Sequence, residues 1–336
     1  MLKVGVIGCG YWGPNLIRNF VQINETEVAR VADLDGSRLR HMKGLYPTIE
    51  TTEDYRDIIT DPQIDIVAVA TPVRTHYRIA LEALSAQKHV FVEKPIAASV
   101  REAEELIALA ERNERKLMVG HTFLYTSAVR KMKEIIDADE LGEIYYINSQ
   151  RLNLGLFQQD INVIWDLAPH DISIILYLLG QEPHSVRAIG TSHINPAIED
   201  IAILTMNFAN GLIAFIQSSW LDPDKVRKMT IVGSKKMLVY DDVQPTEKIR
   251  IYDKGVEKPA HYNTYAEFPY SYKYGDIIIP KLDGAEPIHT QLSHFIECIN
   301  NGAAPISDGK SGLQVVKILE AAQRSLCTGS SPVSIE

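Results

Sequence analysis

The chain has 336 residues, of which 46% are hydrophobic and 23% are charged, and its formal net charge is −9. This length predicts about two domains with substantial cores, and the excess of acid argues against a nucleic-acid or anionic-membrane partner. Three cysteines at unrelated spacings predict reduced thiols in a cytoplasmic protein and no metal site. We expect neither a membrane-spanning segment nor a signal peptide, because no apolar run is long enough and a strand is predicted from residue 3.

The first residues contain a dinucleotide-binding pattern. An apolar strand at residues 3–7 runs directly into Gly8-Cys9-Gly10-Tyr11-Trp12-Gly13. In such a turn Gly8 allows the tight turn, Gly10 leaves the backbone bare for a pyrophosphate, and Gly13 lets the next helix pack on the sheet. Pro14 suits the first position of that helix, whose N-terminal N–H groups attract phosphate.

An acidic residue completes this pattern. The strand at residues 28–32 ends at Asp33, whose carboxylate can accept hydrogen bonds from both hydroxyls of an adenosine ribose. This favours NAD over NADP, because an ionised Asp33 would repel a 2′-phosphate. Arg38 and Arg40 lie close enough in the sequence to keep NADP possible, although a solvated helix face also explains them.

Strands and helices alternate up to about residue 120. The expected strands are 64–70, 89–92 and 116–119, and the expected helices are 75–86 and 99–112. This alternation predicts a Rossmann domain over residues 1–121, with a doubly wound parallel sheet covered on both faces. Ligands bind beyond the carboxyl ends of such strands. Two of these ends carry Ala70-Thr71-Pro72 and Glu93-Lys94-Pro95.

The pattern changes in the second part of the chain, residues 122–336. Strands are expected at 143–152, 186–191, 201–208, 212–218, 229–232 and 237–240, and helices at 127–137, 287–300 and 309–325. They predict an α+β domain whose large, mostly antiparallel open sheet has helices on one face. Its other face is expected to form a homodimer or homotetramer. Residues 261–274, with five tyrosines, could be an oligomer arm or a substrate wall.

Lys94 is a candidate catalytic residue. It follows a parallel strand, between Glu93 and the rigid Pro95, at a place where it would lie beside a bound nicotinamide ring. Its expected role is to hold and polarise a substrate oxygen. A surface lysine that pairs with Glu93 is the alternative.

Asp166 and His170 begin a helix that ends at Gly180, and they are the second candidates. Because they are four residues apart, they can meet on one face of the helix. A histidine oriented by a carboxylate is a suitable general base for an alcohol proton. Alternatively, Asp166 is the N-cap and His170 is structural.

These motifs together resemble the glucose-fructose oxidoreductase, inositol dehydrogenase and rhizopine catabolism (Gfo/Idh/MocA) family. The resemblance rests on Glu93-Lys94-Pro95 and Asp166-x-x-x-His170, and it extends from the glycine turn to the helix containing residues 312–316. It implies that Lys94, Asp166 and His170 are the catalytic set, in which the lysine and the histidine act on a substrate hydroxyl while a hydride passes to nicotinamide. The residues expected to contact the cofactor are Gly8, Gly10, Tyr11, Trp12, Gly13, Asp33, Thr71, Pro72, His76, Glu93 and Lys94.

Residues 10–15 and 165–171 look like those of members found with bacterial surface-polysaccharide and amino-sugar synthesis. This likeness implies oxidation at C3 of a nucleotide-linked sugar such as UDP-N-acetylglucosamine. Arg151, Asn153 and Gln158 could contact the sugar or diphosphate, although a strand arginine is as often a solvated edge charge. Residues 162–165 depart from the glycine pair that many members carry, so the pocket beside the sugar is expected to differ.

Other functions remain open at this point. One alternative is an inositol or free-sugar dehydrogenase, or a ketosugar reductase, of the same family. The other is a regulator that binds the cofactor without turnover, because a fold does not imply a function.

Overall fold

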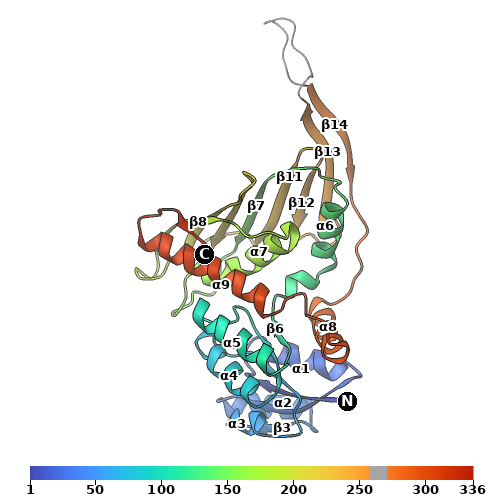
Figure 1. The fold of residues 1–336 in the computed structure, drawn as a ribbon, viewed down its shortest axis with the longest axis vertical. Coiled ribbons are helices and arrows are strands. Elements are labelled where there is room, and N and C mark those ends of the chain that lie inside the picture. The colour runs from blue at the N-terminus through green and yellow to red at the C-terminus, as the bar shows by residue number, and fades with distance from the viewer. Residues whose placement is uncertain (258–270, 336) are drawn as a thin grey trace, which may run out of the picture. The chain divides into compact units, whose positions relative to one another are not determined.

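The computed structural model describes residues 1–257 and 271–335 (Figure 1). The chain forms two compact units. Unit 1 contains residues 1–126 and 285–320, and unit 2 contains residues 127–284 and 321–336.

Unit 1 contains a six-stranded sheet in the order β3-β2-β1-β4-β5-β6, in which every pair of neighbours is parallel. Its strands are β1 (Leu2–Ile7), β2 (Thr26–Ala32), β3 (Glu50–Thr52), β4 (Ile66–Val69), β5 (His89–Val92) and β6 (Leu117–Val119). All four residues of β4 are buried, as expected of a central strand covered on both faces. The predicted doubly wound parallel sheet is confirmed.

Helices connect these strands. They are α1 (Gly13–Gln22), α2 (Gly36–Leu45), α3 (Arg56–Ile59), α4 (Val73–Ser85) and α5 (Val100–Arg112). The side chain of Asp35 caps α2 by accepting the Ser37 N–H at 2.8 Å. The N-cap residue of α1, by contrast, is Trp12, which has no side-chain oxygen. No side chain therefore caps the N-terminus of α1, while the N–H groups of Asn15 and Leu16 donate to the Trp12 carbonyl at 3.0 and 3.1 Å.

Residues 285–320 were expected in the second domain, but the structure places them in unit 1. They form α8 (Pro287–Asn301) and most of α9 (Gly309–Cys327), and they complete the outer edge of β6. The Val119 N–H donates to the Ser307 carbonyl at 2.8 Å, and the Gln291 amide donates to the Val119 carbonyl at 3.2 Å. An edge strand has unpaired backbone groups, and this distant segment satisfies them.

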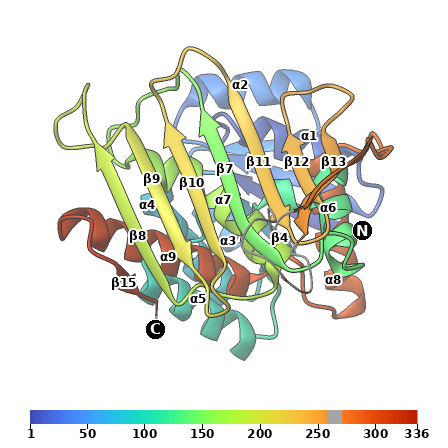
Figure 2. The ribbon, with the colours of Figure 1, turned by 90° about the horizontal axis from the view of Figure 1, so that it is seen from above.

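Unit 2 contains a nine-stranded sheet in the order β14-β13-β12-β11-β7-β10-β9-β8-β15 (Figure 2). The neighbours β7 and β10 are parallel and the others are antiparallel, which confirms the predicted mostly antiparallel sheet. The strands are β7 (Ile144–Leu152), β8 (Ser185–Thr191), β9 (Ile201–Asn207), β10 (Ile213–Ser219), β11 (Val226–Gly233), β12 (Met237–Asp241), β13 (Ile249–Glu257), β14 (Ser271–Ile278) and β15 (Val333–Ser334).

Helices α6 (Ser127–Asp137) and α7 (Val163–Leu179) complete unit 2, and α7 packs against β7, β9 and β10. Along β9, Ala202, Leu204 and Met206 are buried. The alternate positions point away from α7, and Ile203 among them is 43% exposed. Ile189 of β8 is 56% exposed. One face of the sheet therefore carries the helix and the other exposes aliphatic side chains.

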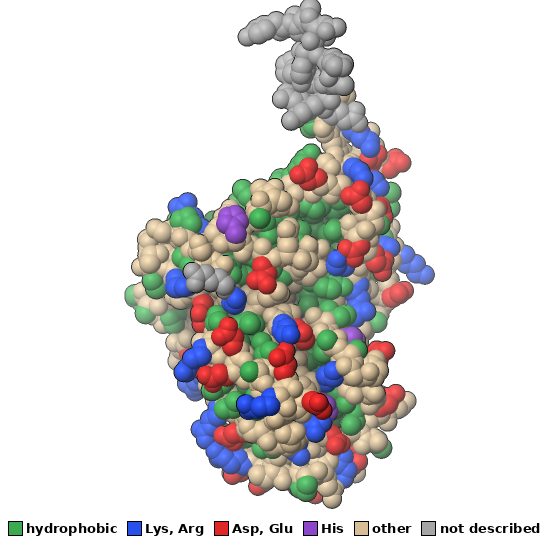
Figure 3. Space-filling view, viewed as in Figure 1, with side chains coloured by type: hydrophobic (Ala, Val, Ile, Leu, Met, Phe, Trp, Pro, Cys, Tyr) green, Lys and Arg blue, Asp and Glu red, His purple; other side chains and the backbone are tan. Residues whose placement is uncertain are grey.

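Acidic and basic side chains are interspersed on the face of the molecule shown in Figure 3. Every residue of β14 is exposed, and the rest of the tyrosine-rich segment, residues 261–270, lies outside the described residues. Within residues 1–257 and 271–335, no helix has the length and apolar character needed to cross a bilayer.

Candidate active site

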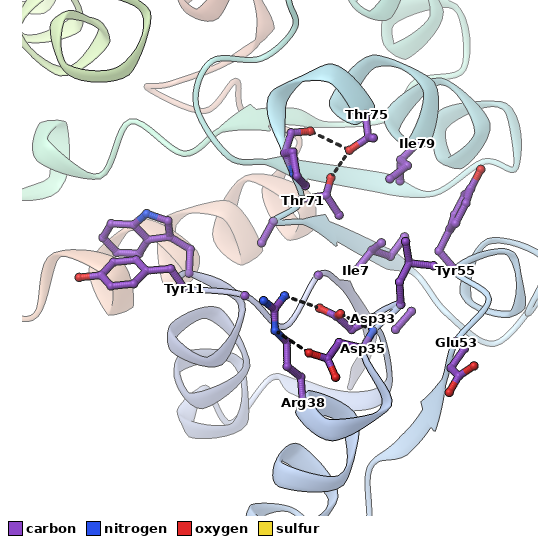
Figure 4. A pocket seen from close by; sticks show the side chains of 17 residues that line it. Ile7, Tyr11, Asp33, Asp35, Arg38, Glu53, Tyr55, Thr71, Thr75 and Ile79 are labelled. Carbon is purple, nitrogen blue, oxygen red and sulfur yellow. Dashed lines mark hydrogen bonds and ion pairs between the residues drawn. The ribbon is translucent and has the colours of Figure 1, made fainter. Parts of the chain in front are cut away.

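A cavity of about 680 Å³ lies in unit 1, where β1, β2 and β4 end (Figure 4). The strand order reverses between the neighbours β1 and β4. Open parallel sheets bind their ligands at such a reversal. This cavity is lined by several of the residues that were expected to contact the cofactor. They are Gly8, Gly10, Tyr11, Trp12, Asp33, Thr71 and Pro72.

The glycine turn fits a dinucleotide. Gly8 has a φ of +98°, and a Cβ there would lie 2.5 Å from the Ala70 carbonyl oxygen. A Cβ on Gly13 would lie 1.9 Å from the carbonyl oxygen of Gly8. Gly10 differs, because its Cβ would approach only the guanidinium of Arg38, at 3.6 Å. Two glycines are thus required by the fold, and the third leaves the cavity open for a phosphate.

Asp33 is held in place at the end of β2. Its Oδ2 accepts the Cys9 N–H at 2.6 Å, and its Oδ1 accepts the Asp35 N–H at 2.8 Å. Arg38 points toward both carboxylates, with Nη1 3.6 Å from Asp33 and Nε 3.5 Å from Asp35 (Figure 4). Carboxylate oxygens accept more than one hydrogen bond each, so Asp33 can still receive ribose hydroxyls.

His76 connects the ends of β4 and β5. Its ring is buried, with Nδ1 2.8 Å from the Pro95 carbonyl and Nε2 2.7 Å from the Thr71 carbonyl. Burial lowers the pKa of His76. Thr71, in turn, lines the cavity, and its hydroxyl oxygen accepts a hydrogen bond from the Thr75 hydroxyl at 2.7 Å. His76 therefore supports a residue of the cavity wall from within the core.

Titratable groups gather where β5 and β6 end. Lys94 is half-buried and is joined to Pro95 by a cis peptide bond. Glu93 is buried, which raises the pKa of its carboxyl group to about 7 although Lys94 acts in the opposite direction. Burial and Lys94 both lower the pKa of His121, to about 3. Within the described part of the chain, neither ring nitrogen of His121 has a hydrogen-bond partner.

In unit 2, the start of α7 presents the other candidates. Asn162 caps the helix by accepting the Trp165 N–H at 3.2 Å, so capping does not account for Asp166. Asp166 is in the first turn and accepts the indole N–H of Trp220 at 3.0 Å. His170 follows four residues later, and both side chains are half-buried on one side of the helix.

The candidate substrate residues precede this helix. Arg151 is in a buried ion pair with Asp171 of α7, with Nε–Oδ2 and Nη2–Oδ1 distances of 2.6 and 3.3 Å. Asn153 and Gln158 lie in the loop between β7 and α7 and are half-buried. The guanidinium of Arg151 thus anchors α7 to β7, whereas the other two side chains reach the surface of unit 2.

Sequence reasoning missed two of these polar groups. His121 lies two residues after the expected strand 116–119, and that position near a third strand end was the signal that could have found it. Trp220 follows the expected strand 212–218, but its bond to Asp166 joins residues 54 apart in the sequence. A local pattern carries no information about such a pair.

Comparison with known proteins places the chain in a family. Residues 2–121 match the model of the oxidoreductase family with an NAD-binding Rossmann fold, and residues 129–239 match the GFO/IDH/MocA C-terminal domain. UDP-N-acetylglucosamine 3-dehydrogenase of Acidithiobacillus ferrooxidans is 27% identical over 76% of this chain and 78% of its own. Its solved structure superposes with a TM-score of 0.80 at 24% identity and 97% coverage of both chains.

Two further relatives match nearly the whole chain. Myo-inositol 2-dehydrogenase of Thermotoga maritima is 23% identical over 97% of this chain and 96% of its own. The WlbA dehydrogenase of Bordetella pertussis, solved with NADH and UDP-GlcNAcA, has a TM-score of 0.82 at 18% identity, covering 100% of this chain and 98% of its own. With its glycine turn, Asp33 and the two matched domains, this chain belongs to the GFO/IDH/MocA family of NAD-binding oxidoreductases.

Proposed function

We propose that this protein is an NAD-dependent dehydrogenase that oxidises the C3 hydroxyl of a nucleotide-linked sugar, such as UDP-N-acetylglucosamine, to a ketosugar. The observation that carries the proposal is the start of α7, where Asp166 is held by a buried donor and His170 follows one turn later. A relative of 27% identity is a UDP-N-acetylglucosamine 3-dehydrogenase, and the WlbA structure contains UDP-GlcNAcA.

Bound NAD supplies the hydride acceptor for this chemistry. The chain's own residues bind and orient it. The glycine turn and the N-terminus of α1 receive the phosphates, because N–H groups and the positive end of the helix dipole favour an anion. Asp33 accepts the hydroxyls of the adenosine ribose.

In the proposed reaction, the imidazole of His170 accepts the proton of the substrate hydroxyl. Asp166, four residues earlier, stabilises the imidazolium that forms. The ammonium group of Lys94 stabilises the negative charge that develops on the substrate oxygen. The hydrogen on the same carbon then leaves with its electron pair, so the secondary alcohol becomes a ketone.

A second candidate is the oxidation of a polyol or free sugar. Myo-inositol 2-dehydrogenase matches this chain over 97% of its length, more than the 76% matched by the nucleotide-sugar enzyme. The same base and carboxylate would serve either substrate, since both present a secondary hydroxyl.

The first experiment measures the absorbance of reduced nicotinamide after the purified protein is mixed with NAD⁺ and one substrate. The substrates are UDP-N-acetylglucosamine, its uronic acid form, free hexoses and myo-inositol, with 2-oxoglutarate added in parallel wells to recycle the cofactor. Turnover with a nucleotide sugar alone supports the proposal. Turnover with myo-inositol or a free hexose instead would overturn it in favour of the second candidate.

The residue assignment is tested by His170→Ala. We expect kcat to fall by about a hundredfold or more, because general base catalysis contributes about that much. Binding of NAD⁺ should persist, since the cavity lies in unit 1. His184→Ala, at an exposed histidine of unit 2, is the matched control. Unchanged turnover in His170→Ala would reject this histidine as the base.

We also propose that the protein is a homodimer or homotetramer formed through the open face of the nine-stranded sheet. Exposed aliphatic residues such as Ile189 and Ile203 on that face support this proposal. All three cysteines are free thiols, which supports a reducing compartment such as the cytoplasm. Sedimentation of Ile203→Lys against the unaltered protein tests the interface, and an unchanged mass would contradict it.

A further inference from the structure

Trp220 lies one residue after β10, which runs beside β7 in the sheet of unit 2 (Figure 2). Its side chain is only 1% exposed and is among the largest that are fully buried. The indole N–H donates to Oδ2 of Asp166 at 3.0 Å. An indole has one donor and no acceptor, so this bond uses its whole hydrogen-bonding capacity.

The backbone around Trp220 is tied to the segments that lead into α7. Its N–H donates to the Asp200 carbonyl at 2.9 Å, and its carbonyl accepts the Gly155 N–H at 3.0 Å. The Val163 N–H, at the start of α7, donates to the Glu199 carbonyl at 3.0 Å. The loop before β9, which contains Glu199 and Asp200, therefore holds both the strand end that carries the indole and the start of the helix that carries Asp166.

Packing also restricts the orientation of the indole ring. A Cβ on Gly155 would lie 2.8 Å from Cδ1 of Trp220, so the loop before α7 lies directly against the ring. Phe157 meets the ring edge-on, with 5.6 Å between the ring centroids. A ring held between these contacts directs its N–H toward one place.

From this geometry we propose that Trp220 is a positioning residue for Asp166. The indole N–H fixes the rotation of the Asp166 carboxylate, and the carboxylate in turn orients His170 during turnover. This inference rests on the proposed function and deepens it, because it assigns a residue that acts through Asp166 rather than on the substrate. Catalysis depends on such orientation, since small displacements of a reacting group cost large factors in rate.

A purely structural role predicts something different. A buried indole N–H needs an acceptor, and Asp166 could serve only to satisfy it. Loss of the bond would then lower the stability of unit 2 and leave turnover per folded molecule unchanged. The two roles are separated by kcat, measured on protein shown to be folded.

The principal test is Trp220→Phe, which keeps a ring and removes the donor. We expect kcat to fall about ten- to a hundredfold while the KM for NAD⁺ stays the same. Phe208→Leu is the matched control, because Phe208 is buried at the opposite end of the β9–β10 hairpin. This control should lose stability and keep kcat. A folded Trp220→Phe protein whose kcat stays within about twofold of the unaltered enzyme overturns the proposal.

A second variant keeps the proposal testable if Trp220→Phe does not fold. Gly155→Ala retains the indole N–H as a chemical group, but its added Cβ would lie 2.8 Å from Cδ1 of Trp220 and pushes the ring out of its position. Gly155 does not require a positive φ, so its backbone accepts alanine. We expect a similar fall in kcat, and an unchanged kcat would contradict the positioning role.

Nuclear magnetic resonance of the three indole N–H groups reports on the bond itself. Asp166→Asn should move the Trp220 resonance to lower proton frequency, because the amide oxygen is a weaker acceptor than a carboxylate. Three unmoved resonances would show that the bond is absent and would overturn the inference.

Parallel assays of Asp166→Asn and His170→Ala separate the two possible failures. If these variants retain turnover, the proposed catalytic assignment is wrong. If they lose turnover while Trp220→Phe and Gly155→Ala retain it, only the role of Trp220 is wrong.

Discussion

Replacing Glu93 by glutamine should make the stability of the protein less dependent on pH. Burial raises the pKa of the Glu93 carboxyl group from 4.5 to about 7. The folded chain therefore binds more protons than the unfolded chain between these values, and stability is lost as the pH rises through them. At about 1.4 kcal/mol per pH unit, this shift corresponds to a loss of about 3 kcal/mol.

Glu93→Gln retains the shape of the protonated side chain and cannot ionise. Urea denaturation without cofactor, from about pH 5 to about pH 8, measures the free energy of unfolding of both proteins. The variant should be within about 1 kcal/mol of the unaltered protein at the acidic end and about 3 kcal/mol more stable at the alkaline end. Glu25→Gln, at an exposed position, is the control. A difference in the free energy of unfolding between the two proteins that does not vary with pH would contradict this prediction.

Other predictions concern the cavity and the core of unit 2. Gly13→Ala should abolish NAD binding and lower the melting temperature, because its Cβ would lie 1.9 Å from the Gly8 carbonyl oxygen; unchanged calorimetric affinity would contradict this. Asp33→Ser should raise the ratio of kcat/KM for NADP over NAD about tenfold, since the anion that repels a 2′-phosphate is removed; steady-state kinetics with both cofactors measures it. Arg151→Met should cost about 3–5 kcal/mol in urea denaturation by leaving Asp171 buried without its ion-pair partner. Adding Asp171→Leu should restore most of that loss, and a double variant as unstable as the single one would argue against a buried-charge penalty.

Local sequence patterns were sufficient to predict the features of this protein that depend on neighbouring residues. The glycine turn was recognisable from the spacing of Gly8, Gly10 and Gly13 directly after an apolar strand. Asp33 was recognisable because it follows a strand at the spacing that a ribose requires. The start of α7 was found from the four-residue spacing of Asp166 and His170, although the residue that caps it, Asn162, was not identified.

Contacts between residues far apart in the chain could not be predicted from such local patterns. Residues 285–320 return to unit 1 because the edge of β6 needs hydrogen-bond partners, and no helical pattern indicates which edge a helix will cover. From its position in the strand, Arg151 could have faced a substrate, but in the folded chain it is buried against Asp171. The bond between Trp220 and Asp166 depends on the register of β10 against β9 and on the packing of α7. Burial and long-range contact are properties of the packed chain, whereas turns, caps and periodicity arise within a few residues, and this difference set the limit of what the sequence could predict.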